Sequence, residues 1–397
     1  MNTALKHWKE AATLILVAGQ RPVSDGFSRT ARSVACAHLG SSHGQSHLPH
    51  KSSFDYDVLM LKRSSKSGFM PNAYVFPGGL VDSSDFSSEW LDIFKHARNS
   101  PNYGLASVRQ PLDTRPPIFA TDRQKLGSPI PGEVAFRICA LRETFEESGV
   151  LLVVPKPGET SFFTGTDLRC ATNNNVSGLC SKELVKWRAL VNRNPSNFVR
   201  MCRELEVVPN IWALREWSNW LTPKARPGSR RYNTAFFICC LQDVPVSLQD
   251  GKEIVRVQWS APSEVLQNFH AKEFWIAPPQ FYELSRMCRL PLLSDLHEFS
   301  IQRAREGCEQ WMPVVVQDGQ LMSLLPGDGL YPLSTSEEAK EDKGTDLQQE
   351  DPLNCGLHRI LFLDSYNLNI QITITPKHNH LVPVVGPAIP RDLSSKC

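Results

Sequence analysis

The fold of this chain is decided by residues 142–150, which read Arg142-Glu143-Thr144-Phe145-Glu146-Glu147-Ser148-Gly149-Val150. Apolar residues recur every three or four positions before and within this stretch, at Val134, Ile138, Leu141 and Phe145. At about 100° per residue these side chains form one stripe of an α-helix, and Glu143, Glu146 and Glu147 lie on the opposite side. We therefore predict a helix over residues 133–148 that ends at Gly149 in a left-handed conformation.

The three glutamates of this helix are spaced i, i+3 and i+4. Like charges at this spacing repel one another by about a few tenths of a kcal/mol per pair, and a cation between them removes the repulsion. Mg²⁺ and Mn²⁺ prefer carboxylate oxygens, and such an ion can bridge phosphate oxygens and activate a bound water. Taken alone, however, this pattern is more often a solvated acidic face, because surface helices are rich in Glu. Other features must support a metal site.

The composition narrows the class of protein. The chain has 397 residues, 41% of them hydrophobic and 21% charged, as in ordinary globular proteins. A formal net charge of +2 disfavours nucleic acid as a partner, since such binding requires a clustered basic surface. No apolar run reaches the roughly 18–20 residues of a membrane span. We interpret residues 11–19 as a first buried strand rather than as the apolar part of a secretory signal.

The 11 cysteines are irregularly spaced and form no CxxC pair. This pattern disfavours both a structural zinc site and a disulfide framework. We interpret the cysteines as mostly buried free thiols in a reducing compartment.

Hydrophobic periodicity and turn residues predict the remaining elements. Strands are expected over residues 11–18, 57–62, 73–76, 232–241 and 254–259, and hairpins over 313–325 and 358–375. Helices are expected over residues 89–96, 182–205, 263–269, 279–289 and 293–309, the third starting at a Ser263 cap. Residues 83–131 are rich in proline and weakly periodic, which indicates a surface insertion.

The glutamate helix resembles the second half of the Nudix box, G-x5-E-x7-R-E-U-x-E-E-x-G-U, where U is a bulky apolar residue. The matching positions are Arg142, Glu143, Glu146, Glu147, Gly149 and Val150. Thr144 replaces an apolar residue. The first half of the box resembles Phe76-Pro77-Gly78-Gly79, with Asp85 in place of the expected Glu, and an insertion of about fifty residues splits the two halves. Eight residues separate Glu133 from the Arg142-Glu143 pair, whereas the box has seven, which puts a role for Glu133 in doubt.

This resemblance implies an α/β protein: a Nudix α/β/α sandwich with a mixed β-sheet, long insertions and a C-terminal α+β extension. It also implies that Glu143, Glu146 and Glu147 hold Mg²⁺ or Mn²⁺ and are the catalytic residues. Two glycines without a Cβ let the backbone approach phosphate oxygens. Arg142 has five donors in a fixed geometry, so we expect it to orient one of the glutamates rather than to contact phosphate. The residue that serves as general base stays open.

The segment before the glycines resembles the motif of Nudix coenzyme A diphosphatases, L-L-T-x-R-S-x3-R-x3-G-x3-F-P-G-G. Residues at matching spacing are Leu59, Met60, Arg63, Ser64, Phe76, Pro77, Gly78 and Gly79. Leu61, Gly68 and Asn72 depart from it, and Gly68 lacks the expected arginine charge. Arg63 is a candidate to bind the substrate's phosphates, with a surface arginine at a strand end as the alternative. Phe76, Pro77, Gly78 and Gly79 complete the expected substrate-binding residues.

A longer likeness covers most of the chain and is to the peroxisomal acyl-coenzyme A diphosphatases of the Nudix motif 19 type. It rests on residues 68–71, 135–140, 211–214, 217–223, 234–237 and 278–281. The resemblance implies hydrolysis of coenzyme A and its acyl esters to 3′,5′-ADP and (acyl-)4′-phosphopantetheine. Two alternatives stay open: a Nudix enzyme for ADP-ribose, a dinucleotide or an RNA cap, and a non-catalytic Nudix scaffold that binds its ligand.

With this family in view, we predict the domain organisation. A Nudix hydrolase domain covers residues 8–270, with insertions at about 20–52, 86–130 and 155–205. Residues 271–332 form a helical and hairpin extension packed on it. An acidic flexible linker spans residues 333–356, and a C-terminal hairpin with a targeting-like tail spans residues 357–397.

The final tripeptide, Ser395-Lys396-Cys397, matches a peroxisomal Ser-Lys-Leu import signal in two of three positions. We therefore expect a peroxisomal import receptor as a partner and a peroxisomal location, with the cytosol or mitochondrion as alternatives.

Two weaker patterns favour structural interpretations. His378 and His380 lack a third nearby ligand, so a solvated pair is expected rather than a metal site. Trp212, Trp217 and Trp220 are expected to pack in the core rather than to stack on an adenine.

Overall fold

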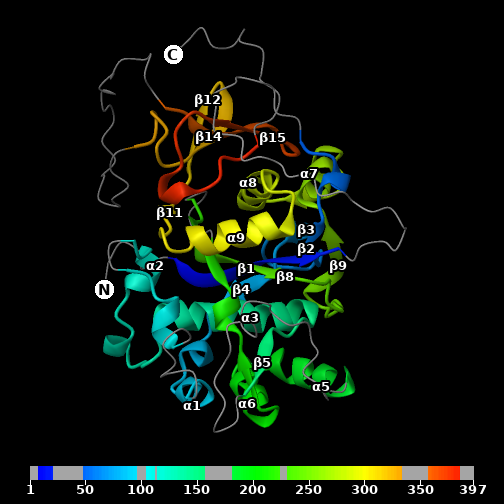
Figure 1. The fold of residues 1–397 in the computed structure, drawn as a ribbon. Helices are drawn as coiled ribbons and strands as arrows, with labels where there is room; N and C mark the ends of the chain where they lie inside the picture. The colour runs from blue at the N-terminus through cyan, green and yellow to red at the C-terminus, as the bar shows by residue number, and fades with distance from the viewer. Residues whose placement is uncertain are drawn as a thin grey trace.

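The computed structural model describes residues 8–20, 48–95, 104–111, 114–156, 181–223, 230–332 and 356–384. Within them the chain forms a large mixed sheet between two helical layers, with a smaller sheet stacked beyond one layer (Figure 1). Residues 333–355 of the predicted linker, residues 385–397 of the tail and most of the insertion at 20–52 lie outside the described residues. No described helix is long and apolar enough to cross a membrane.

The large sheet has nine strands, and seven of them follow the order β10-β3-β2-β1-β8-β7-β11, with β4 paired to β1 and β9 to β2. Their bounds are β1 Lys9–Gly19, β2 Tyr56–Arg63, β3 Ala73–Val75, β4 Gly78–Leu80, β7 Arg215–Leu221, β8 Tyr232–Leu241, β9 Ile254–Ser260, β10 Trp275–Ile276 and β11 Gln310–Trp311. A separate pair is formed by β5 Val153–Pro155 and β6 Val207–Pro209. The five predicted strands of the central sheet are confirmed.

Strand β1 lies at the centre of the sheet, parallel to β8 and antiparallel to β2 and β4. Its apolar side chains alternate between the two faces: Leu14 and Leu16 pack toward α3, and Ile15 and Val17 pack into the opposite core. A strand covered on both faces reads as a continuous apolar run. This explains why residues 11–19 resemble a signal sequence although they form a strand.

The helices cover both faces of the large sheet (Figure 1). Helices α1, α3, α5 and α6 lie on one side, and α7, α8 and α9 lie on the other. Their bounds are α1 Trp90–Ile93, α2 Pro117–Ala120, α3 Gly132–Ser148, α5 Ser181–Val191, α6 Asn197–Glu204, α7 Pro262–His270, α8 Pro278–Met287 and α9 Leu293–Arg303. Short 3-10 turns are η2 Lys51–Ser53, η3 Ser83–Phe86, η4 Leu105–Val108, η5 Gln124–Leu126, η6 Ile211–Ala213 and η7 Lys377–Asn379. The expected α/β/α sandwich with a mixed sheet is confirmed.

Three details of the sequence prediction are wrong. The single helix expected over residues 182–205 is two helices, because Pro195 cannot continue a helix and α6 restarts at Asn197. The expected Ser263 cap is absent, since α7 begins one residue earlier at Pro262 and Ala261 occupies the cap position without a side-chain hydrogen bond. Helix α9 ends at Arg303 rather than at residue 309.

The proline-rich segment 83–131 is also more than a surface insertion. Its described part supplies Trp90, Phe94, Ile118 and Phe119 to the core beneath α3, each no more than 4% exposed. Phe119 packs edge-on against Phe136 of α3, with ring centroids 5.5 Å apart. Part of the insertion therefore supports the glutamate helix.

The smaller sheet is antiparallel and contains β12 Val314–Asp318, β13 Gln320–Leu324, β14 His358–Asp364 and β15 Asn367–Ile372. Both predicted hairpins are confirmed, and the first turns at Gly319, whose φ is +65°. Pairing of β13 with β14 joins the two hairpins in one sheet. His358 of β14 and Tyr282 of α8 share a buried hydrogen bond of 2.8 Å, which ties this sheet to the rest of the protein.

This contact makes stability depend on pH. Burial lowers the pKa of His358 from 6.5 to about 4, so the imidazole stays neutral in the fold. In the unfolded chain this imidazole takes up a proton near pH 6.5. Its contribution to the free energy of unfolding is therefore fully present above pH 6.5 and is lost as the pH falls toward 4. We expect this residue alone to remove about 3 kcal/mol by pH 4. Urea unfolding at pH 7 and 4.5 should show a smaller loss for His358→Gln than for the wild type. The control His50→Gln changes an exposed histidine and should lose as much unfolding free energy between the two pH values as the wild type. An equal loss in all three proteins would contradict the prediction.

Candidate active site

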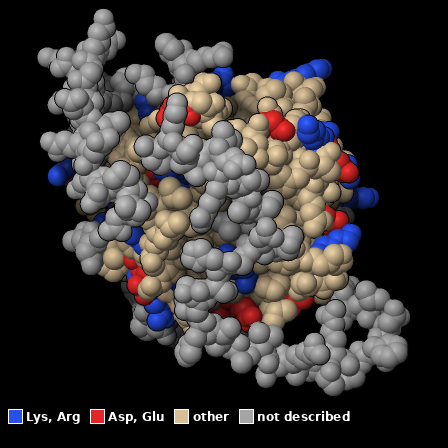
Figure 2. Space-filling model, turned by 90° about the horizontal axis from the view of Figure 1, so that it is seen from above, with Lys and Arg blue, Asp and Glu red and all other residues tan. Residues whose placement is uncertain are grey.

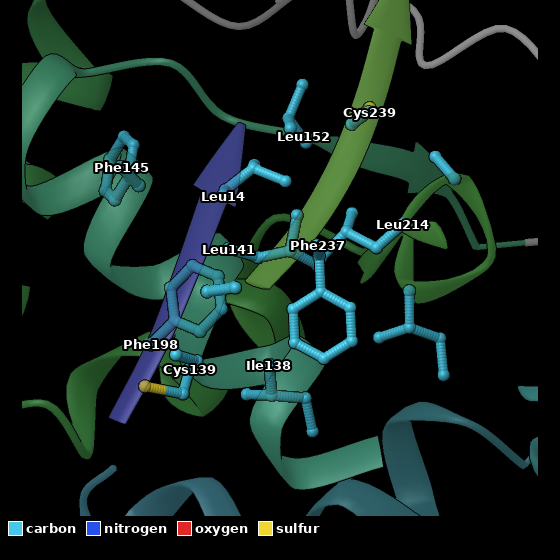
Figure 3. Packing of buried hydrophobic residues seen from close by; sticks show 14 of the residues in the cluster. Leu14, Ile138, Cys139, Leu141, Phe145, Leu152, Phe198, Leu214, Phe237 and Cys239 are labelled. Carbon is cyan, nitrogen blue, oxygen red and sulfur yellow. The ribbon is translucent and has the colours of Figure 1, made fainter. Parts of the chain in front are cut away.

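Helix α3 positions the glutamates because one of its sides is held firmly by the core. Ile138, Leu141 and Phe145 pack with Leu14 of β1 and Phe237 of β8 (Figure 3). The helix ends at Gly149 with φ +74°, and the Gly149 N–H donates to the Phe145 carbonyl over 2.9 Å. Thr144, the polar residue at an apolar position of the box, is fully buried and donates its hydroxyl to the Ala140 carbonyl. The predicted helix and its C-cap are confirmed.

The two glycines of β4 lie directly beside these glutamates. The Gly78 N–H donates to Glu147 Oε2 over 2.9 Å. A Cβ placed on Gly79 would lie 2.5 Å from the Glu143 carboxylate carbon. The two glycines and the acids, which are 60 or more residues apart in the chain, therefore form one site. Glycine is required at position 79 because the Glu143 carboxylate occupies the space where a Cβ would lie.

Arg142 connects the box on its buried side. Its guanidinium forms a two-point ion pair with Asp85, with both distances 2.9 Å. Its Nη1 also donates to Glu143 Oε1 and Glu146 Oε1, each over 2.8 Å. The arginine expected to orient one glutamate thus contacts two. Asp85, which stands in place of the box Glu, is itself 1% exposed and accepts the Asp82 N–H.

Glu133 takes no part in this cluster. Its carboxylate pairs with Arg115 Nε over 2.9 Å and is almost fully buried. The one-residue offset seen in the sequence therefore corresponds to a different ion pair.

The electrostatics of the site indicate a shortage of positive charge. The pKa of Glu143 is raised to about 7, chiefly by burial and also by the nearby Glu146 charge, against the lowering effect of Arg142. Burial and the Glu143 charge raise the pKa of Glu147 well above its usual value, and burial also raises the pKa of Glu146. Crowded, desolvated carboxylates of this kind are stabilised by a cation.

The donor set fits a hard divalent cation. Within the described residues, no three His, Cys, Asp or Glu side chains converge closely enough to hold an ion as they stand, and Arg142 lies between Glu143 and Glu146. The oxygens left outside the hydrogen bonds above are Glu143 Oε2, Glu146 Oε2 and Glu147 Oε1. Three carboxylate oxygens on one side of a helix are ligands that Mg²⁺ and Mn²⁺ prefer.

A second charged pair, Arg63 and Glu253, borders the site. Arg63 Nη2 lies 2.6 Å from Glu253 Oε1, and its Nε donates to the Phe69 carbonyl. Arg63 lowers the pKa of Glu147, whereas Glu253 raises it, so both charges lie within electrostatic range of the box. The arginine expected to bind phosphate is therefore already engaged with a carboxylate. Sequence reasoning missed Glu253, because no motif marks it.

Phe76 and Pro77, the other expected substrate contacts, are buried. The Phe76 ring is 2% exposed and packs edge-on against Phe236, in the core on the sheet face opposite α3. The Pro77 carbonyl accepts the Leu14 N–H. The Phe76 ring thus fills the core and leaves only its backbone near the glycines, and its assignment as a substrate-binding residue stays a prediction.

The tryptophan and histidine patterns have structural roles. All three tryptophans are at most 4% exposed, and Trp217 and Trp220 both donate to the buried Glu283. His380 is half-buried and hydrogen-bonds the Trp217 carbonyl, so the expected solvated pair is wrong for this residue. The cysteines that the structure describes are all free and buried, as predicted. On the face shown in Figure 2, acidic and basic side chains are interspersed among the described residues.

The geometry of the glycines predicts the effect of one substitution. In Gly79→Ala the new methyl group displaces the Glu143 carboxylate, and we expect Mg²⁺ affinity to fall about 10- to 100-fold, the usual cost of disturbing the groups that orient metal ligands. Isothermal titration with Mg²⁺ measures the effect. Gly251→Ala is the control, because a Cβ there meets no atom within 4 Å, although its positive φ costs some stability. Unchanged affinity in Gly79→Ala would contradict this geometry.

Comparison with known proteins gives the family. A family model described as the NUDT19 Nudix domain matches residues 8–287, and one described as the NUDT19 C-terminal domain matches residues 314–373. The chain is 45% identical to the acyl-coenzyme A diphosphatase NUDT19 of Xenopus laevis, over 97% of both chains. It is also 45% identical to the Gallus gallus protein of that name over 97% of both chains, and 38% identical to that of Homo sapiens over 95% of this chain and 94% of the relative. Together with the split box assembled around Gly79 and α3, these matches show that the chain belongs to the NUDT19 family of Nudix hydrolases.

Proposed function

We propose that this chain is a diphosphatase that hydrolyses coenzyme A and acyl-coenzyme A esters, using Mg²⁺ or Mn²⁺. The products would be 3′,5′-ADP and 4′-phosphopantetheine or its acyl ester. The observation that carries the proposal is the contact of Gly78 and Gly79 of β4 with Glu147 and Glu143 of α3, respectively. The substrate class is supported by the printed name of relatives that are 38–45% identical over nearly the whole chain.

Three groups of residues at the site have different proposed roles. Glu143 and Glu147, with Glu146, would hold the divalent ion, which when bound neutralises phosphate charge and lowers the pKa of a water. Gly78 and Gly79 let β4 lie against its neighbours, because a Cβ on Gly78 would lie 2.5 Å from the Ala12 carbonyl oxygen and one on Gly79 2.5 Å from the Glu143 carboxylate carbon. Arg142 and Asp85 keep the carboxylates in position from the buried side.

Arg63 is proposed as a phosphate contact that exchanges partners. In this structure Glu253 neutralises it, and a diphosphate offers the same guanidinium a second anionic partner. Binding in this way would leave Glu253 beside the site as an unpaired carboxylate. Arginine suits this role because its planar donors match a phosphate as well as a carboxylate.

One assay separates the candidate substrates. The purified full chain is incubated with Mg²⁺ and either coenzyme A esters, ADP-ribose, NADH or capped RNA, and the products are identified by mass. Release of 3′,5′-ADP from coenzyme A esters supports the proposal. Preferential turnover of another nucleotide diphosphate would assign a different Nudix substrate, and no turnover with either metal would favour the binding scaffold.

A peroxisomal location, with an import receptor as partner, stays a prediction. The tripeptide on which it depends, residues 395–397, lies outside the described residues. The test is a fluorescent reporter carrying the last twelve residues of the chain, compared with the same reporter lacking the tripeptide. Diffuse cytosolic fluorescence of both would contradict the prediction.

A further inference from the structure

The last turn of α3 is held from outside the Nudix box by helix α5. Residues 181–191 lie in an insertion between β5 and β6, and they add no strand to the large sheet. Trp187 and Val191 anchor the helix, because both are buried in the core that α3 shares with the sheet. This packing places Arg188, which follows Trp187, against the C-terminal end of α3.

Arg188 makes a contact that α3 cannot make for itself. The last four carbonyls of a helix lack partners within it, and the Glu146 carbonyl is one of them. Arg188 Nε donates to this carbonyl over 2.9 Å, and Asn192 Nδ2 approaches the same oxygen at 3.5 Å. The positive charge also lies at the negative end of the helix dipole, where cations are favourable.

The Arg188 guanidinium packs closely against Gly149. A Cβ on Gly149 would lie 3.3 Å from Arg188 Nη1 and 3.6 Å from Cζ, so the group lies against the glycine. The neighbouring Ser148 carbonyl accepts the Leu248 N–H over 2.8 Å. Two segments from elsewhere in the chain therefore hold the backbone of the turn that carries Glu146 and Glu147.

We propose that Arg188 is a positioning residue of the active site, which fixes the last turn of α3 so that Glu146 and Glu147 present their carboxylates to a divalent ion. This assigns a functional role to the α5 insertion, and it rests on the proposed metal-dependent function. Loss of the contact should loosen the turn, since the Glu146 carbonyl would keep only the 3.5 Å contact with Asn192 Nδ2 and hydrogen bonds to water. Arg188 acts through the backbone and touches neither ion nor substrate.

The test measures Mn²⁺ binding by electron paramagnetic resonance in the full chain without substrate. In Arg188→Ala we expect affinity to fall about 10-fold, as when other groups that orient metal ligands are removed. Arg188→Lys keeps the charge and one donor and should recover part of the affinity. Val191→Ala is the matched control, because it opens a cavity on the same helix and lowers Tm without touching the Glu146 carbonyl.

Each outcome decides the proposal. Weak binding by Arg188→Ala with wild-type binding by Val191→Ala and partial recovery by Arg188→Lys supports it. Unchanged binding by Arg188→Ala, or equal weakening by Arg188→Ala and Val191→Ala below both Tm values, overturns it. Failure of the proposed function is seen separately, because a wild-type protein that turns over no coenzyme A ester still allows the Mn²⁺ titration to be read.

Discussion

Glu147→Gln is expected to lower the rate of hydrolysis by about 10³-fold while leaving the fold intact. The amide has the shape of the carboxylate, and its oxygen can still accept the Gly78 N–H that Glu147 accepts over 2.9 Å. What is lost is the negative charge that would hold the ion. Metal ions contribute several kcal/mol of charge stabilisation, and each 1.36 kcal/mol is a factor of about ten in rate.

The measurement is the initial rate of 3′,5′-ADP release at saturating Mg²⁺, with Tm recorded for each protein. Glu204→Gln is the control, since this exposed glutamate forms only a surface ion pair with Arg200. Near wild-type rates in Glu147→Gln would show that this carboxylate holds no catalytic ion. A Tm at or above the wild-type value is expected, because the substitution removes a buried charge that burial destabilises.

The sequence predicted those parts of the site that depend on neighbours along the chain. The stripe from Val134 to Phe145 specified which side of α3 meets the sheet, and that determined where the three glutamates point. Gly149 marked the end of the helix because a residue with φ +74° favours glycine. The prediction of one helix over residues 182–205 was wrong although the sequence held the evidence against it, because Pro195 interrupts the helical pattern.

The rest depends on partners far apart in the chain. Arg142 and Asp85 are 57 residues apart, Arg63 and Glu253 are 190 apart, and Arg188 meets the Glu146 carbonyl across 42 residues. Each pairing depends on how strands and insertions pack in space, and the hydrophobic periodicity of the sequence does not reveal that packing. The proline-rich segment 83–131 shows the same limit, because it supplies both core aromatic rings and the carboxylate that Arg142 requires.

Asp85→Ala is expected to lower the free energy of unfolding by about 3 kcal/mol, the lower end for a buried ion pair that loses one partner. Arg142 is 1% exposed, so the substitution leaves its guanidinium buried without its two-point partner. The cost stays at the lower end because Glu143 and Glu146 still accept from Nη1. Urea unfolding of metal-free protein at pH 7 measures it, with Asp122→Ala as the control for an exposed ion pair.

The same substitution should also weaken the metal site, and this distinguishes the Arg142–Asp85 pair from a merely structural one. Without Asp85, the guanidinium charge is shared only between Glu143 and Glu146, where it competes with a divalent ion for the same carboxylates. Asp85→Asn keeps an oxygen for Arg142 but no charge, so its Mg²⁺ affinity should be reduced with a smaller loss of stability. If both variants bind Mg²⁺ as the wild type does, Asp85 contributes packing and an ion pair alone, and the acid that replaces the box glutamate has no part in tuning the site.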